Sequence, residues 1–285
     1  MEDSFSVRVK IETATQAVKK PIQRQTALCG LILCGTPSDS GIEIKIPGRL
    51  SELIDHLFQA ENINCSCTGN KISIKDFSSS GLYVRYNELK EAIKNETLTV
   101  EEARRLLRGA FWSTGYCSDP NKNYRIEFLL PDENIAGIVS ASLNVLSIKH
   151  IKTTRKNAVC VYFKNGDDVS DFLSYIGSPS AMMEFENVRA GKDVNSMVTR
   201  AVNCDEGNTK RQAEAAAARN EHIKKIMESG MVNKLAPELR EAAKAQFENP
   251  GASIAELGAM MDPPIGKSGM KHRLAKIAEF AKSLE

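Results

Sequence analysis

The sequence predicts an α+β protein in which two αββαββα lobes are followed by an all-α helix-turn-helix domain. Two apolar helical segments, residues 25–35 and 105–115, have glycine at the same place, Gly30 and Gly109. An alternating strand, a helix and paired strands follow each segment, which indicates an internal duplication. Near the end of the chain, two helical patterns meet at residues 262–266, a turn whose two prolines and glycine neither helix interior can absorb.

The first predicted lobe occupies residues 1–95 and the second residues 96–186. After its apolar helix, the first lobe has a strand pattern at 42–46, a helix at 51–59 and strand signals at 63–67 and 72–74. The second lobe repeats this order, with a strand at 124–128, a helix at 132–146, strands at 147–153 and 158–163 and a closing helix at 169–176. Thr99 and Glu102 have the spacing of a capping box, so we expect the second apolar helix to begin there.

The two repeated glycines are expected to mark the interface between the lobes. Glycine inside a helix costs about 1 kcal/mol relative to alanine, so its recurrence requires a reason. Without a side chain, two helix backbones can approach each other closely. We therefore expect Gly30 and Gly109 to lie where the two apolar helices pack together. The alternative, that two similar helices arose by chance in a chain rich in leucine and alanine, stays open at this point.

Residues 187–230 are predicted to form a helical linker, broken near residues 203–208, and residues 231–285 a helix-turn-helix domain. Within that domain, Ser253 and Glu256 have capping-box spacing at the start of a short helix. The following helix carries an apolar stripe when its residues are placed at about 100° intervals. The stripe, which we expect to be buried, consists of Met270, Leu274, Ile277, Ala278 and Ala281.

The opposite side of this last helix carries Ser268, His272, Lys276 and Glu279, with Lys271 and Arg273 on its flanks. A basic helix after a turn has the form of a recognition helix for a DNA major groove. A solvated surface helix explains the same pattern equally well. A phosphate-binding loop ending at residues 266–268 is disfavoured, because that loop needs a glycine where this chain has Met261.

The composition of the chain indicates its cellular compartment and its need for cofactors, but says little about its binding partners. The chain of 285 residues has no run of about 18 apolar residues and no signal-like start, so we expect a cytoplasmic protein without a membrane span. Its seven cysteines lack framework spacing, which favours reduced thiols. Cys65 and Cys67 are too close together for a zinc knuckle and have no second pair, so we expect no metal and no cofactor. A net charge of +2 says little about partners.

The repeated motif resembles that of the LAGLIDADG homing-endonuclease fold, in which two motif helices pair between lobes and each contributes a carboxylate to metal-dependent strand cleavage. Further segments are similar to the WhiA family of bacterial transcription regulators, whose N-terminal region has this fold. These segments are Arg108-Gly-Ala-Phe111, Ser118-Asp-Pro120, Tyr124-Arg-Ile-Glu-Phe128, Phe185-Glu-Asn-Val-Arg189, Arg200-Ala-Val-Asn-Cys204, Asn249-Pro-Gly-Ala-Ser253 and His272-Arg-Leu274. They follow the order of the family from about residue 20 to the C-terminus.

The chain departs from the nuclease pattern where the metal-binding carboxylates should stand. Gly35 occupies this position in the first copy and Thr114 in the second. Metal-assisted cleavage of a phosphodiester needs anionic oxygen ligands to hold the cation. We therefore expect no enzymatic activity, although Glu127 and Asp119 lie nearby in the sequence and an active endonuclease remains an alternative.

The WhiA resemblance implies a nucleoid-associated regulator of cell division, chromosome segregation or sporulation that binds double-stranded promoter DNA, with a WhiB-type regulator as a possible partner and no small-molecule substrate. By position, Ser268, Lys271, His272 and Arg273 are the expected groove contacts, and Lys267 and Lys276 the expected phosphate contacts. Arg200 on the linker is a further candidate for a phosphate contact. A protein-interaction platform with secondary DNA binding is the other alternative.

Overall fold

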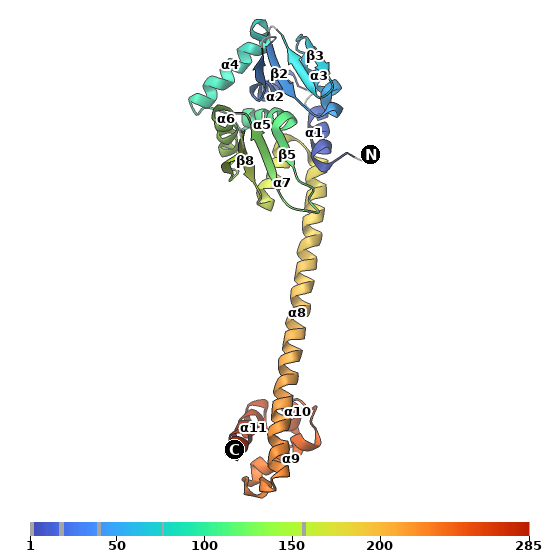
Figure 1. Cartoon of the computed structure of the whole chain (residues 1–285), viewed down its shortest axis with the longest axis vertical. Helices are drawn as coiled ribbons and strands as arrows, with labels where there is room; N and C mark the ends of the chain where they lie inside the picture. Colours follow the sequence, from blue (N-terminus) through green and yellow to red (C-terminus); the bar gives the residue numbers. More distant parts are fainter. Residues whose placement is uncertain (1–2, 17–19, 39–40, 76, 156–157, 285) are drawn as a thin grey trace. The chain divides into compact units, whose positions relative to one another are not determined.

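The computed structural model describes residues 3–16, 20–38, 41–75, 77–155 and 158–284 of the chain. These divide into two compact units, residues 1–193 and residues 194–285, which are described separately (Figure 1).

The N-terminal unit contains two copies of the same αββαββα arrangement, so the predicted duplication is confirmed. In the first copy these elements are α2 (Pro21–Leu33), β1 (Thr36–Ser38), β2 (Gly41–Lys45), α3 (Ser51–Gln59), β3 (Cys65–Thr68), β4 (Lys71–Ile74) and α4 (Gly81–Lys94). In the second they are α5 (Val100–Thr114), β5 (Gly115–Cys117), β6 (Ile126–Leu130), α6 (Glu133–Val145), β7 (Ile151–Arg155), β8 (Ala158–Phe163) and α7 (Gly166–Ile176). Both sheets are antiparallel, with the strand orders β1-β2-β4-β3 and β5-β6-β8-β7.

Alternation along the second strand of each copy decides which side chains reach the core. In β6, Ile126, Phe128 and Leu130 are buried, whereas Glu127 and Leu129 lie on the opposite face. The period of two in a strand produces this separation. Strand β6 begins two residues later than predicted, and β7 occupies 151–155 in place of the predicted 147–153, because residues 147–150 form the connection from α6.

Helices α2 and α5 pack against each other along the middle of the N-terminal unit (Figure 1). They cross at the two repeated glycines. A methyl group on Gly30 would collide with the backbone of Leu106, whose Cα would lie 2.9 Å from it. A methyl group on Gly109 would collide with the Ala27 carbonyl and lie 2.7 Å from the Leu31 nitrogen. Only glycine permits this backbone approach at either position.

Helix α1 (Phe5–Gln16) precedes the first copy in the chain but forms hydrogen bonds with the second copy. The Trp112 indole donates to the Thr13 hydroxyl at 2.9 Å, and the Cys117 backbone N–H donates to the Ser6 hydroxyl at 3.1 Å. The Glu12 carboxylate accepts from the Ser178 hydroxyl at 2.5 Å and from the Ser180 backbone N–H at 2.9 Å. This last pair of bonds satisfies polar groups at the start of α8 (Pro179–Glu228).

Helix α8 is continuous for 50 residues, so the predicted break near residues 203–208 is wrong. Asn203, Gly207 and Asn208 lie at the expected break, and asparagine and glycine are poor helix formers. Their cost of about 1 kcal/mol or less each is too small to end a helix that contains no proline beyond its first residue. Local bonds accompany the helix here, since the Arg211 Nε donates to the Gly207 carbonyl at 3.0 Å.

The C-terminal unit forms a small helical bundle around its own apolar core. It consists of the end of α8, α9 (Pro237–Glu248), α10 (Ile254–Ala259) and α11 (Lys267–Lys282). Ile223 and Ile226 near the end of α8 are buried in this core, together with Leu257 of α10 and Leu274 of α11. The capping boxes predicted at Thr99 and Ser253 are both present.

Candidate nucleic-acid interface

A tight turn holds α10 and α11 together. The Gly258 carbonyl accepts from the Ile265 backbone N–H at 2.9 Å, across the two prolines of the turn. A side chain at Gly258 would collide with the Ile265 carbonyl. The prolines and Gly266 mark this turn in the sequence, whereas the role of Gly258 depends on the return of the chain onto α10 and has no local sequence signal. The turn therefore sets the approach of α11 to α10.

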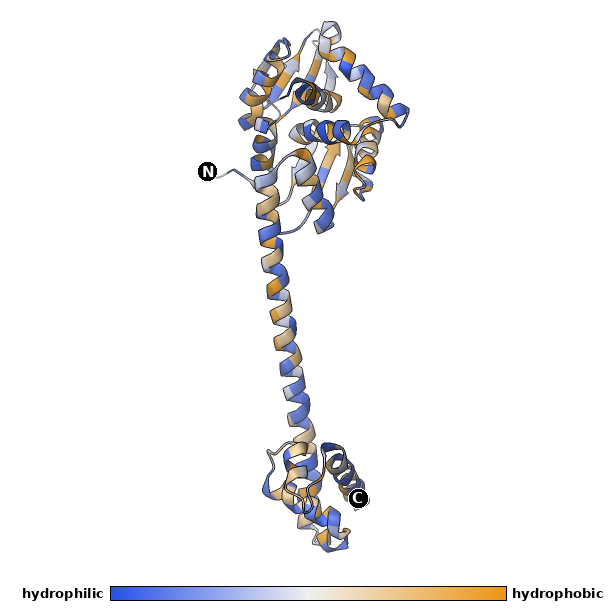
Figure 2. Ribbon diagram, turned by 180° about the vertical axis from the view of Figure 1, so that it is seen from behind, coloured by the Kyte–Doolittle hydropathy of each residue, from blue (hydrophilic) through white to orange (hydrophobic). Residues whose placement is uncertain are grey.

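The buried side of α11 agrees with the helical-wheel prediction. Met270, Leu274, Ile277 and Ala281 are buried, and Ala278 is half-buried. They pack in the core formed with α9 and α10. Figure 2 shows a largely hydrophilic outer side for this helix.

Five of the candidate contact residues are exposed on that outer side of the helix-turn-helix. These are Lys267, Ser268, Lys271, His272 and Lys276. Lys267 and Ser268 stand in the first turn of α11, where backbone N–H groups lack helical partners and favour an anion. The structure thus brings three lysines, a hydroxyl and an imidazole together on one exposed helix.

Arg273 differs from its neighbours because it is already paired within the bundle. Its side chain is 21% exposed, and its guanidinium lies 3.6 Å from a carboxylate oxygen of Glu241 on α9. The same nitrogen donates to the Glu238 carbonyl at 3.5 Å. These contacts tie α11 to α9 and offset part of the positive charge of Arg273.

Arg200 lies on α8 and is exposed. Its guanidinium folds back along the helix and donates to the hydroxyl and carbonyl oxygens of Ser196, at 3.0 and 3.3 Å. Among the residues that the structure describes, no hydrogen bond or ion pair joins Arg200 to α11. It is therefore a separate positive group on α8.

A buried polar network fixes the end of α8 against α9, and sequence reasoning missed it. The Gln246 side chain is fully buried and donates to the Asn220 Oδ1 at 2.8 Å. Arg219 donates to the Gln246 Oε1 at 3.3 Å, and the Asn220 amide donates to the Pro250 carbonyl at 3.1 Å. A groove of about 880 Å³ runs between residues 208–220 of α8 and residues 250–256 and reaches Lys267. No local sequence pattern connects residues so far apart.

A second candidate site lies at the C-terminal ends of the two motif helices, α2 and α5. The Thr114 hydroxyl donates to the Ala110 carbonyl at 2.9 Å and lies 3.8 Å from the Cys34 sulfur. Burial raises the pKa of the Cys34 thiol to about 12, so it is protonated at neutral pH. Gly35, beside it, carries no side chain at all. These groups offer no anionic oxygen to a cation.

Glu127 and Asp119, the acidic residues near Thr114 in the sequence, are bound to other groups. Glu127 accepts from the Arg125 Nε at 2.7 Å and lies 3.7 Å from Arg155. Asp119 accepts from the backbone and side chain of Asn121, at 2.9 and 3.1 Å. Within the described ranges, neither belongs to a group of three potential metal ligands.

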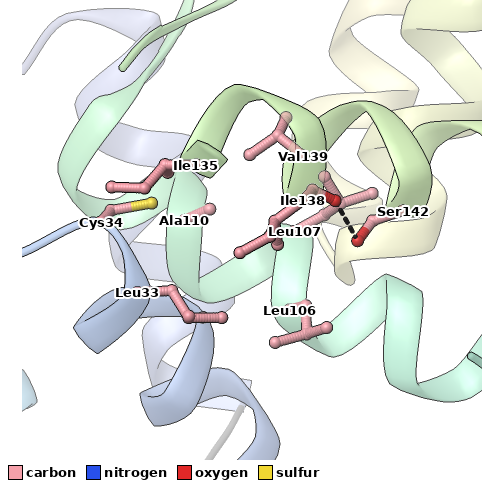
Figure 3. A pocket seen from close by; sticks show the side chains of 10 residues that line it. Leu33, Cys34, Leu106, Leu107, Ala110, Ile135, Ile138, Val139 and Ser142 are labelled. Carbon is pink, nitrogen blue, oxygen red and sulfur yellow. Dashed lines mark hydrogen bonds between the residues drawn. The ribbon is translucent and has the colours of Figure 1, made fainter. Parts of the chain in front are cut away.

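The space between α2, α5 and α6 is also too small for a substrate (Figure 3). Its volume is about 10 Å³, at the limit for a single water molecule. The lining is apolar except for Ser142, whose hydroxyl donates to the Ile138 carbonyl at 2.9 Å, and the Cys34 thiol. This cavity is a packing void at the junction of the lobes.

Across the part of the chain that the structure covers, no helix combines the length and the apolar character that a bilayer crossing requires.

Comparison with known proteins matches both units to domains of one family. The family model described as the WhiA LAGLIDADG-like domain matches residues 103–195. The family model described as the WhiA C-terminal HTH domain matches residues 198–281. The solved structure of full-length DUF199/WhiA from Thermatoga maritima is 23% identical, with a TM-score of 0.63 and coverage of 99% of each chain. That structural likeness supports the fold: duplicated lobes followed by a helical domain.

Curated relatives are named as probable cell division proteins of the same family. The WhiA of Desulfitobacterium hafniense is 36% identical over 215 residues, which cover 75% of this chain and 68% of that protein. The WhiA of Clostridium beijerinckii is 39% identical over 181 residues, covering 64% of this chain and 58% of that protein. The chain thus aligns with rather more than half the length of the clostridial relative.

Proposed function

Because the chain belongs to the WhiA family, we propose that it is a sequence-specific DNA-binding transcription regulator without catalytic activity. The observation that supports this most is the exposed basic side of α11, presented by a helix whose other side is locked into a bundle. The names of its relatives favour a role in cell division. Chromosome segregation or sporulation, action at promoters in the nucleoid and a WhiB-type partner belong to the same proposal.

Each candidate residue has a proposed part in DNA binding. Ser268, Lys271 and His272 contact base edges in the major groove, where hydroxyl, ammonium and imidazole groups can read hydrogen-bonding patterns. Lys267 and Lys276 contact phosphates, which position the helix. Arg200 adds a phosphate contact from α8. Arg273 is a flank contact whose charge is shared with Glu241.

The absence of catalysis rests on Gly35 and Thr114. The nuclease chemistry of this fold requires carboxylates at these two positions, and neither residue can hold a divalent cation through an anionic oxygen. The duplicated lobes then serve as a scaffold for the regulator. The domain limits proposed from the sequence, 1–95, 96–186, 187–230 and 231–285, stay part of this proposal.

The test measures promoter binding by the 285-residue chain with His272 and Lys276 replaced by alanine. Both side chains are exposed, so the double variant should keep the thermal midpoint of the wild type. Loss of one base contact and one phosphate contact should weaken specific binding by about 1–3 kcal/mol. The negative slope of log affinity against log salt should become less steep by about 0.9. Lys94→Ala, an exposed lysine on α4, removes charge outside the bundle and should change neither quantity.

Two outcomes would favour other functions. Unchanged promoter affinity in the double variant, with normal folding, would remove the basis for a recognition helix. If the double variant lost promoter binding yet supported growth and division like the wild type, the protein would act mainly as an interaction platform. Conversion of supercoiled plasmid to nicked or linear forms with Mg²⁺ or Mn²⁺ would instead identify an endonuclease.

A further inference from the structure

Three side chains of types that bind metals converge at the edge of the first sheet, in the N-terminal unit. They are Asp55 on α3 and Cys65 and Cys67 on β3. One ligand atom from each lies within 4.8 Å of the other two. In the described portion of the chain, this is the one group of three such residues.

The fold explains the convergence. Residues two apart in a strand point to the same face, so both thiols of β3 project to one side. Pairing of Cys65 with Ile74 and of Cys67 with Ile72 fixes the strand in register on β4. Helix α3 buries Ile54, Leu57 and Phe58, which leaves Asp55 at the border of the buried side. The Cys65 thiol reaches the Asp55 Oδ1 at 3.0 Å.

The carboxylate of Asp55 is held in place by a second residue. The Gln59 amide, one turn later on α3, donates to the Asp55 Oδ2 at 2.7 Å. This leaves Oδ1 directed at the thiols. Hydrogen-bonded supports of this kind orient ligands in metal sites. The hydrogen bond from Gln59 therefore fixes the orientation of the Asp55 carboxylate.

The cluster is also accessible from solvent. Cys67 is exposed, and Asp55 and Cys65 are half-buried. A cation can enter from the open side of β3, and a water molecule can occupy the position that the protein leaves free. A site with three protein ligands and one water is a common arrangement for zinc.

We propose that Asp55, Cys65 and Cys67 form a binding site for a divalent cation of the zinc class, completed by water. Two thiolates and one carboxylate suit Zn²⁺ or Cd²⁺ and disfavour Mg²⁺, which prefers oxygen ligands in octahedral geometry. Binding replaces the two thiol protons by the cation and releases them to solvent. The third ligand of this site is a carboxylate from the preceding helix, and not a thiol from the second cysteine pair that a zinc knuckle would need.

The experiment titrates the reduced, metal-free 285-residue chain with Co²⁺, whose bonds to thiolates produce charge-transfer absorption. We expect one Co²⁺ per chain with this absorption, and its displacement by Zn²⁺. Cys65→Ser and Cys67→Ser should each remove the absorption and lower Zn²⁺ affinity by at least about tenfold. Gln59→Ala, which leaves all three ligands in place, should lower the affinity by about tenfold.

Cys204→Ser is the matched control, because Cys204 is an exposed thiol on α8 in the other unit. It should leave stoichiometry, absorption and affinity unchanged. Circular dichroism of the metal-free variants checks that they fold, and Zn²⁺ should raise the thermal midpoint of the wild type but not of Cys67→Ser. Failure of the wild type to bind, a cobalt complex without thiolate absorption, or equal affinity in the cysteine variants would overturn the proposal.

Discussion

The crossing of α2 and α5 provides a quantitative test of the fold through Gly109→Ala. The added methyl group would collide with the Ala27 carbonyl, and the Leu31 nitrogen would lie 2.7 Å away. Both are backbone atoms of α2, so no side chain can rotate to make room. The two helices would have to move apart along the central contact of the N-terminal unit.

The expected loss of stability combines two effects of opposite sign. Alanine favours a helix over glycine by about 1 kcal/mol. Overpacking of a tight contact costs about 1–3 kcal/mol, and a backbone collision belongs at the upper end. The net destabilisation should be about 2 kcal/mol. For a unit of this size, this lowers the thermal midpoint by roughly 4–8 °C.

Gly137→Ala is the matched control, because Gly137 is exposed in the middle of α6 and a methyl group there meets nothing within 4 Å. It should raise the free energy of unfolding by about 0.5–1 kcal/mol. Thermal and urea denaturation of both variants measure the difference. If Gly109→Ala were as stable as Gly137→Ala, the close approach of α2 and α5 at Gly109 would be refuted.

Two further predictions concern charges on α1. Lys10 is 5% exposed, and burial lowers its pKa from 10.5 to about 8. The unfolded chain therefore holds this proton more tightly, and stability should rise by roughly 3 kcal/mol as pH increases from 8 through 10.5. Lys10→Met should abolish that rise in urea unfolding at graded pH, and a persisting rise would contradict the assignment. Burial opposes ionisation of Glu12, but bonds from Ser178, Ser180 and Ala181 lower its pKa overall. Glu12→Gln should cost about 1 kcal/mol at neutral pH, and its difference from wild type should vanish as acid protonates Glu12 below its ordinary pKa; a difference that persists in acid would contradict this.

Patterns with a short range in the sequence predicted much of the fold. The repeated order of helices and strands, the capping boxes at Thr99 and Ser253 and the buried stripe of α11 all depend on residues a few positions apart. Helical and strand periodicity therefore reports them directly. The exposed positions of Ser268, Lys271, His272 and Lys276 follow from the same wheel.

Features set by distant partners could not be predicted in this way. The bonds of α1 to the second copy, the network around Gln246 and the third ligand beside Cys65 join residues that only tertiary packing brings together. The prediction of a break in α8 was wrong for a different reason. Glycine and asparagine lower helix propensity by a small amount, and neighbouring turns override that preference when no proline interrupts them.

The contacts at the helix crossing are reciprocal. Gly30 meets Leu106, and Gly109 meets Ala27, which are equivalent positions in the two repeats. This exchange of partners is the signature of a twofold axis, as between two identical subunits. The crossing therefore has two symmetric halves, and an added methyl group on either glycine would push the same pair of helices apart from the opposite side.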